Sequence, residues 1–273
     1  MFARDCLVVS THTLCSTIGH ASSVKLTNTS WAYAAMKIRH PALLNAIGDV
    51  IAETDYLSEF AHQDVYNTIW AYNTVYESHP ALFRKMDEAI EALGGLGTFK
   101  SEHIAHMARA FAAADIDSPL IFDDDFRVEL HSKRDQFATH EMSLLHQWHL
   151  WQQGEKDKPG LPKSLQVCCR QAFIKSKMIS SELRRSVVSE LICIGLHQIE
   201  EFLTASGYRH DALVETNGQK IGVKIDGPCH FIGKKPNERT ILKHRLVTSS
   251  DGIRLVSLPY WEWNELGNDS SKR

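Results

Sequence analysis

The chain is predicted to fold as an α-helical repeat array, an α-solenoid of two-helix units that span ~39 residues, followed by a small α/β domain. An aromatic triplet and a proline recur at a fixed spacing along the first half of the 273 residues. The last quarter instead alternates strand, sharp turn, basic helix and strand, which predicts a β-α-β unit. Residues 1–130 carry 9 Lys and Arg against 17 Asp and Glu, whereas residues 131–273 carry 21 against 16. This polarity favours a polyanionic partner for the second half, or two domains with different solvated surfaces.

The repeat is defined by the triplet Trp-Ala-Tyr and by the prolines that follow it. The triplet begins at Trp31 and again 39 residues later at Trp70, and further steps of 39 lead to Arg109 and Trp148. A proline lies ten residues after the start of each triplet, except that the fourth is one residue late: Pro41, Pro80, Pro119 and Pro159. A fixed period of this length is typical of stacked helical repeats.

Each unit is expected to contain two helices, the first carrying the triplet and the second beginning at the proline, which suits the first helical position. The expected first helices are 28–38, 64–76, 102–113 and 141–152. Ser118 is a suitable N-cap before Pro119, and Gly94–Gly95 ends the second helix of its unit. A lone helix pair cannot bury its apolar stripe, so aromatic residues are expected to form the core between units, including Trp31, Trp70 and Trp148.

A basic junction connects the two parts of the chain. We divide the sequence into an N-terminal tail (1–26), the repeat domain (27–162), the junction (163–207) and the C-terminal α/β domain (208–273). The first part of the junction is expected to be helical, and it contains one acid, Glu182, among six cations: Lys163, Arg170, Lys175, Lys177, Arg184 and Arg185. These cations contact phosphates or form a solvated helix face. An amphipathic helix at 187–203 would pack on the sheet of the C-terminal domain.

The C-terminal domain is built from short elements that end in charged and aromatic residues. A β-branched strand at 221–225 stops at Gly227–Pro228, and a basic helix at 240–246 follows it. A second strand at 254–258 is stopped by proline. Beyond it, Trp261 and Trp263 are expected on one face at strand spacing, as core packing or, for one of them, as a stacking surface for a base.

Three ordered motifs in this region resemble the RAP domain, a small C-terminal module of organellar RNA-binding proteins. They are Lys224-Ile225-Asp226-Gly227-Pro228-Cys229-His230-Phe231, Leu242-Lys243-His244-Arg245-Leu246 and Pro259-Tyr260-Trp261-Glu262-Trp263. The resemblance covers residues 208–266 and implies a minimal core of the PD-(D/E)XK nuclease fold. The repeats, over residues 27–170, are similar to the octotricopeptide and FAST-kinase-domain repeats that precede RAP domains. That similarity implies single-stranded RNA bound along a concave face, about one base per repeat.

The resemblance leaves open whether the domain cleaves RNA. Where this chain has Lys224, the family usually has a glutamate, and a lysine supplies a cation in place of a metal ligand. A Mg²⁺-dependent RNA endonuclease would use Asp211, Asp226 and His230, with His230 as general acid or base. The simpler expectation is that Lys224 binds phosphate, that His230 holds the turn, and that the protein needs no metal or other cofactor.

The function predicted from the sequence is an organellar RNA-binding protein that stabilises, processes or assembles rRNA or mRNA, for example as a component of the mitochondrial ribosome. The candidate RNA-binding residues are Lys163, Arg170, Lys175, Lys177, Arg184, Arg185, Lys224, His230, Lys234, Lys235, Lys243, His244 and Arg245. The acidic repeats would dock ribosomal or RNA-processing proteins. The alternatives are the endonuclease and a protein-interaction scaffold with a dead nuclease fold.

The composition of the N-terminus bears on localisation. Residues 1–48 contain a single acid, Asp5, and many Ser and Thr residues. This composition resembles an organellar transit segment, so we expect a mitochondrial protein, with the plastid as the alternative. The sequence has no run of 18 apolar residues, so neither a membrane-spanning helix nor a membrane partner is expected.

Overall fold

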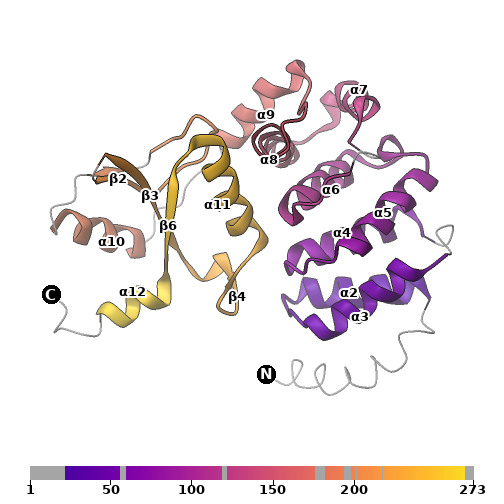
Figure 1. Cartoon of the computed structure of the whole chain (residues 1–273), viewed down its shortest axis with the longest axis horizontal. Coiled ribbons are helices and arrows are strands. Elements are labelled where there is room, and N and C mark those ends of the chain that lie inside the picture. Colours follow the sequence, from indigo (N-terminus) through magenta and orange to yellow (C-terminus); the bar gives the residue numbers. More distant parts are fainter. Residues whose placement is uncertain are drawn as a thin grey trace.

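The computed structural model describes residues 22–55, 60–118, 122–175, 182–193, 198–200, 202–216 and 218–267. Its N-terminal part is a stack of helix pairs, and its C-terminal part is a small sheet flanked by helices (Figure 1). The predicted fold class, a helical repeat array followed by an α/β domain, is therefore confirmed. Helix α11 (Glu238–Asp251) lies between the sheet and the repeats and contacts both.

The first helices of the four described units are stacked in chain order. They are α2 (Ser23–Ala35), α4 (His62–Thr74), α6 (Ser101–Ala114) and α8 (Thr139–Glu155), and each packs on the next. Three residues that lie 39 positions apart, Lys37, Tyr76 and Asp115, follow the first three of these helices with positive φ values of 54°, 50° and 57°. Such a left-handed residue ends a helix, so the period seen in the sequence is also a period of helix termination.

The second helices are α3 (Pro41–Glu53), α5 (Pro80–Ala92), α7 (Asp124–Ser132) and α9 (Lys163–Lys175). As predicted, α3 and α5 begin at their prolines. In both, the histidine before the proline caps the helix. The ring nitrogens of His40 and His79 each accept a hydrogen bond of 3.1 Å from a backbone amide in the first turn.

The second helices of the later units do not begin at the predicted prolines. Helix α7 begins at Asp124, because the Asp123 carboxylate accepts a hydrogen bond of 2.8 Å from the Phe126 amide and acts as the N-cap that Ser118 was expected to be. Helix α9 begins at Lys163, past Pro159. It packs on α8, so the array extends through 175 and includes part of the predicted junction.

The register of the fourth unit is shifted by one residue. The first helices have their N-caps at Ser22, Ala61, Lys100 and Ala138. Counted from these caps, Trp31, Trp70 and Arg109 correspond to Gln147 rather than to the predicted Trp148. Trp148 is 1% exposed, as expected of a core residue, and packs against the rings of Phe122 and Phe126.

Trp31 is not in the core, contrary to the prediction, since 45% of its surface is exposed. Helix α2 is the first described helix, so Trp31 has a described neighbour in the stack on one side alone. That neighbour is the half-buried Trp70, whose ring centroid lies 6.5 Å from that of Trp31.

The main sheet has the order β1-β2-β3-β6, formed by β1 (Gln198–Glu200), β2 (Ala212–Thr216), β3 (Gln219–Asp226) and β6 (Arg254–Pro259). The first three strands are antiparallel, whereas β3 and β6 are parallel and are connected through α11. This is the predicted β-α-β unit. A small hairpin of β4 (Phe231–Ile232) and β5 (Lys235–Pro236) precedes α11. Three short 3₁₀ turns complete the described elements: Leu96–Thr98, Arg134–Gln136 and Pro228–His230.

Two predicted elements of the C-terminal part differ in the structure. The helix expected at 187–203 is α10 (Glu182–Cys193), which ends earlier and is followed by β1, although it does pack on β3. The segment after β6 is a helix, α12 (Tyr260–Gly267), so Trp261 and Trp263 do not share a strand face. Residues two apart on a helix point in different directions. Trp261 packs on Phe231, with 4.5 Å between ring centroids.

Arg245 of α11 joins the C-terminal domain to the repeats. Its guanidinium donates hydrogen bonds of 3.2 and 3.1 Å to the carbonyl oxygens of Ala112 and Ala113, at the end of α6. It also pairs with Glu155 and, at 3.1 Å, with Asp115. The apolar core is continuous across this contact, so the two parts are packed as one body.

Candidate nucleic-acid interface

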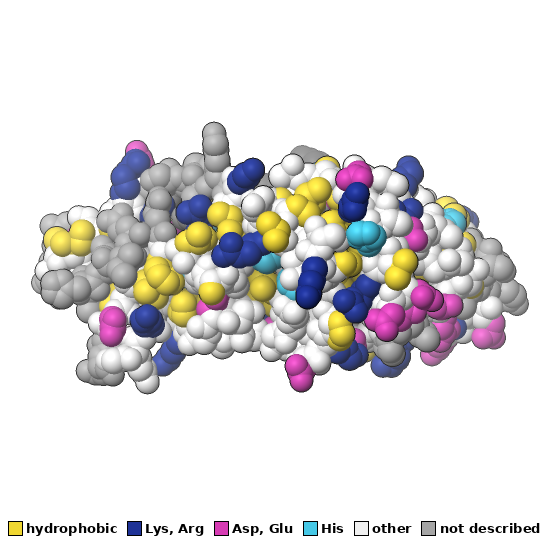
Figure 2. All heavy atoms as spheres, turned by 90° about the horizontal axis from the view of Figure 1, so that it is seen from above, with side chains coloured by type: hydrophobic (Ala, Val, Ile, Leu, Met, Phe, Trp, Pro, Cys, Tyr) yellow, Lys and Arg dark blue, Asp and Glu magenta, His cyan; other side chains and the backbone are white. Residues whose placement is uncertain are grey.

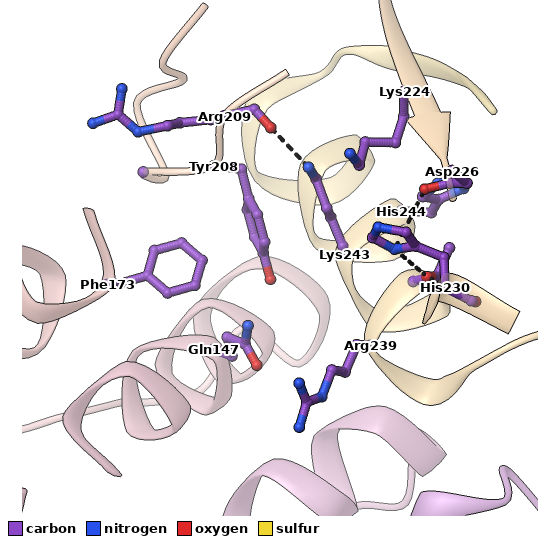
Figure 3. A pocket seen from close by; sticks show the side chains of 12 residues that line it. Gln147, Phe173, Tyr208, Arg209, Lys224, Asp226, His230, Arg239, Lys243 and His244 are labelled. Atoms are coloured by element: carbon purple, nitrogen blue, oxygen red, sulfur yellow. Dashed lines mark hydrogen bonds and ion pairs between the residues drawn. The ribbon is translucent and has the colours of Figure 1, made fainter. Parts of the chain in front are cut away.

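A pocket of about 270 Å³ opens where the C-terminal domain meets the last repeat (Figure 3). The repeats contribute Gln147 of α8 and Phe173 of α9, and the segment before β2 contributes Gly207, Tyr208 and Arg209. The rest of the lining comes from the end of β3, the turn after it and α11: Lys224, Asp226, His230, Arg239, Thr240, Lys243 and His244.

The local sequence brings the polar side chains of the C-terminal domain together at one end of the sheet. Lys224 and Asp226 are two residues apart on β3, so their side chains lie on the same face. The turn after β3 returns His230 to this end, where its Nδ1 lies 3.5 Å from Asp226 Oδ1 and 3.3 Å from Thr240 Oγ1. Asn237 caps α11 by accepting a hydrogen bond of 3.0 Å from the Thr240 amide, so the helix begins beside this turn.

Asp211, the first of the three acids and bases predicted for a nuclease, is bonded to cations and an amide. Lys224 Nζ donates a hydrogen bond of 2.8 Å to Asp211 Oδ2, and the Ile225 amide donates one of 2.9 Å to the same oxygen. Arg184 Nε lies 3.7 Å from the other oxygen, Oδ1. Burial alone would raise the pKa of Asp211, but the charge and hydrogen bond of Lys224 and the Ile225 amide outweigh it and lower the pKa.

These contacts disfavour a divalent metal at Asp211, because the carboxylate is already paired with cations and an amide. A metal needs several oxygen ligands with free lone pairs, and the Lys224 ammonium already lies against this carboxylate. In the described part of the chain, no cluster of three or more His, Cys, Asp or Glu side chains could hold a metal ion. The residues present do not fit the Mg²⁺ site that the endonuclease hypothesis needs.

Asp226 and His230, the other two nuclease candidates, do lie together. Asp226 is fully buried and accepts a hydrogen bond from the Ser257 hydroxyl of β6. The backbone amide of His230 donates to the Gly227 carbonyl at 3.0 Å, and its carbonyl accepts from the Asn237 amide at 2.9 Å. His230 therefore holds the turn, as the simpler expectation had it, while its ring faces the pocket.

Lys243 carries a charge that no carboxylate of the described residues contacts directly. Its Nζ donates a hydrogen bond of 2.7 Å to the carbonyl of Arg209 and lies 5.7 Å from the centroid of the Tyr208 ring. Burial, and next the charge of Lys224, lower the pKa of Lys243 to about 7. Burial is also the main cause that lowers the pKa of His230 and His244. Positive charge in this pocket is therefore poorly compensated by the protein itself.

The structure divides the predicted RNA-binding residues into groups. Six have exposed side chains on the outer surface: Lys163, Arg170, Lys175, Arg185, Lys234 and Lys235. Four line the pocket: Lys224, His230, Lys243 and His244. Arg184 and Arg245 are instead engaged inside the protein, with Asp211 and with the repeats, so we leave both out of the RNA-binding set. Lys177 lies outside the described residues.

The charge polarity of the sequence is also visible on the surface. On the face drawn in Figure 2, Asp and Glu side chains gather towards the right-hand end, where Figure 1 places the repeats, and Lys and Arg side chains spread over the middle and left. A polyanion approaching this face would therefore meet favourable charge near the C-terminal domain and repulsion near the early repeats.

Seven pocket residues were not predicted as site residues: Gln147, Phe173, Gly207, Tyr208, Arg209, Arg239 and Thr240. The first five belong to two repeat helices and to the segment before β2, and no local motif connects these positions. Arg239 immediately precedes the predicted basic helix at 240–246, so its proximity to that helix was a signal that could have identified it.

Comparison with known families assigns the C-terminal part of the chain. Residues 223–273 match the RAP domain. The protein carries a C-terminal RAP domain. The matched range contains Lys224 and Asp226 of β3, the turn at His230 and all of α11. Asp211 and the repeats precede it.

The RAP domain points to RNA binding as the general function. No curated protein matches the chain in a search of the whole sequence. Within the described ranges, none of the helices is both long and apolar enough to cross a bilayer.

Proposed function

We propose that the protein binds RNA on the basic surface that the RAP domain forms with the last repeat, and that it stabilises, processes or assembles organellar rRNA or mRNA. The observation that carries this proposal is the cation-lined pocket at that junction, to which both parts of the chain contribute. The mitochondrion is the proposed location, with the plastid as the alternative, because the N-terminal composition resembles a transit segment.

Exposed cations on α9, on α10 and on the small hairpin supply the contacts to phosphates. Lys163 and Lys175 stand at the two ends of α9, Arg185 lies on α10, and Lys234 and Lys235 lie on the small hairpin. Each phosphate that such a side chain neutralises releases counterions, which makes the affinity depend on salt but not on sequence.

Base contacts are proposed for the first two repeats. Helix α11 covers the first helices of the third and fourth units, where Arg109 lies 3.8 Å from Glu238 at the start of α11. In the first two units the equivalent positions are Trp31 and Trp70, which are exposed and half-buried. Aromatic side chains at a surface can stack on bases, at about 1–3 kcal/mol per base.

Binding without cleavage is favoured over the endonuclease because the Asp211 carboxylate, which would be a metal ligand, is paired with Lys224. The acidic early repeats would repel a phosphate backbone, so contact with RNA is proposed there for the aromatic positions alone, and docking of a ribosomal or RNA-processing protein is proposed for the rest of their surface. A permanent component of a mitochondrial ribosome would combine both kinds of contact.

The binding proposal is tested by fluorescence anisotropy with a labelled single-stranded RNA at a series of salt concentrations. The double variant Lys163→Ala with Lys175→Ala is expected to reduce the slope of log K against log salt by about two. The matched control, Arg84→Ala with Arg134→Ala, removes two exposed cations from the repeats and is expected to leave the slope unchanged. Equal effects of the two double variants on the slope, or no binding of RNA at all, would contradict the proposal that RNA binds at this surface.

The cellular role is tested by ultraviolet crosslinking of the tagged protein to RNA in its own cells. Peaks on organellar rRNA support a ribosomal or assembly role, and peaks at transcript ends support processing or protection. No enrichment over background would favour the protein-interaction scaffold.

A further inference from the structure

The pocket has the size of a site for a small ligand. Its volume of about 270 Å³ lies near the lower end of the range usual for such sites, about 300–1,000 Å³, which suits one nucleotide better than a duplex. The walls differ in chemistry (Figure 3): Phe173 and Tyr208 lie on the side of the repeats, and the lysines and histidines lie on the side of the RAP domain. The two aromatic rings pack edge to face, with 4.8 Å between their centroids.

The lysines of the pocket are short of negative charge. Lys224 has Asp211 as its carboxylate partner, but Lys243 is bonded to a neutral carbonyl oxygen and lies close enough to Lys224 for the charge of Lys224 to disfavour that of Lys243. Asp226 is the single carboxylate in the lining, and it is already bonded to Ser257. A ligand with two negative charges would offset the cost of holding both ammonium groups here.

Three buried polar atoms of the lining have no hydrogen-bond partner within the described residues. They are Nε2 of His244, Oδ1 of Asp226, which has only the longer contact of 3.5 Å with His230 Nδ1, and the hydroxyl of Tyr208. Buried polar groups are normally satisfied, because leaving one unpaired costs about 1–3 kcal/mol. The first can bond to an oxygen of a ligand, and the second can accept from a hydroxyl or amino group. A sugar or base carries such donors, whereas a bare phosphate dianion does not.

We propose that this pocket binds one nucleotide through a terminal phosphate monoester, with the phosphate at Lys224 and Lys243 and the base beside Phe173 and Tyr208. The proposal rests on the proposed function in taking the end of an RNA strand as the source of this nucleotide. A free nucleoside monophosphate offers the same chemistry. A phosphate inside a strand carries one charge, whereas a terminal monoester carries close to two at neutral pH, which suits a lining that holds Arg209 and Arg239 besides Lys224 and Lys243.

The test compares single-stranded RNAs of one sequence, about ten nucleotides long, that end in hydroxyl groups, in a 5′-phosphate or in a 3′-phosphate. Binding is measured by competition against a labelled hydroxyl-ended strand. One phosphorylated end is expected to bind about 10-fold more tightly than the hydroxyl-ended strand. In parallel, uridine monophosphate is expected to raise the Tm of the protein, and uridine at the same concentration is not.

Two variants separate the pocket from the surface. Lys243→Met is expected to remove the preference for a phosphorylated end, because it removes one of the two ammonium groups at the proposed phosphate position. Lys163→Ala with Lys175→Ala is expected to weaken all strands alike and to keep the preference. The comparison of ends with the unaltered protein decides the proposal even if Lys243→Met fails to fold.

The outcomes distinguish this inference from the proposed function. Equal affinity for all three strands, with no effect of uridine monophosphate on Tm, overturns the nucleotide pocket and leaves RNA binding in place. Failure of every strand to bind, with a rise of Tm in uridine monophosphate, overturns the proposed function and assigns the pocket to a free nucleotide.

Discussion

Lys224 Nζ lies 2.8 Å from Asp211 Oδ2, and this ion pair ties the end of β3 to the residue that precedes β2. Both side chains are nearly buried, with 12% and 4% of their surfaces exposed. The carboxylate that would be a metal ligand in a nuclease is thus part of a buried ion pair, and the Lys224 ammonium lies where a metal ion would have to bind it.

Asp211→Asn is expected to destabilise the protein strongly, because it leaves the Lys224 ammonium in a buried place without its carboxylate. Breaking one side of a buried pair typically costs about 3–5 kcal/mol of unfolding free energy. Asp124→Asn is the matched control, since its pair with Arg127 is on the surface and is worth under ~1 kcal/mol. Urea unfolding measures both variants, and equal effects would contradict a buried, structural role for Asp211.

Lys224→Glu is expected to create a dependence on divalent cations that the unaltered protein lacks. The variant places a second carboxylate beside Asp211, so like charges repel and Tm falls in the presence of a chelator. Added Mg²⁺ or Mn²⁺ would offset this repulsion and raise the Tm of the variant. Lys224→Gln controls for loss of the lysine, because it brings no carboxylate. If the Tm of the variant does not change when Mg²⁺ or Mn²⁺ is added, Asp211 and position 224 are not arranged as metal ligands.

Arg245→Met is expected to weaken the packing of the RAP domain on the repeats. The change keeps the length of the side chain but removes the bonds to the carbonyls of Ala112 and Ala113 and to Glu155, so these acceptors lose their charged donor. We expect a loss of roughly 3 kcal/mol, seen in urea unfolding as a lower midpoint or as two separate transitions. Arg254→Met, at an exposed position on β6, should change the midpoint little. Were the two variants equally stable, Arg245 would not be the connection between the domains.

The stability contributed by Lys243 is expected to depend on pH. Its pKa is about 7 in the folded protein and ~10.4 in the unfolded chain, so between these values the unfolded chain holds a proton that the folded protein has lost. The contribution of Lys243 to the free energy of unfolding therefore rises with pH across that window. Below pH 7 the full cost of burying its ammonium group is present.

Lys243→Met removes this cost together with one hydrogen bond, so the variant should be more stable than the parent at pH 6 by about 1–2 kcal/mol. The difference should shrink by pH 9.5. Urea unfolding at the two pH values measures it, with the exposed Lys163→Met as the control. A variant that is less stable than the parent at pH 6, or a difference that grows with pH, would show that the Lys243 charge is well compensated in the folded protein.

Local chemistry explains which parts of the fold could be predicted from the sequence. The spacing of helix starts and stops repeats along the chain, since the histidine-proline pairs at 40–41 and 79–80 and the left-handed residues after the first helices act within one turn of backbone. The strand, turn and helix around His230 were likewise visible as a local pattern, and the RAP motifs fixed their order. Lys224 and Lys243 were identified as site residues because they belong to those motifs.

Contacts between distant segments decided the rest. Whether Arg245 meets phosphate or the end of α6 depends on how α11 packs across a separation of 132 and 133 residues, and no local signal encodes that packing. The exposure of Trp31 depends on its place in the stack, and the one-residue shift at Trp148 depends on where α8 is capped. The pocket requires Gln147, Phe173 and Tyr208 to meet the RAP domain. The sequence by itself determined the elements and their order, because turns and caps are local; only the tertiary structure determined which charges face solvent, because burial depends on what packs against each side chain.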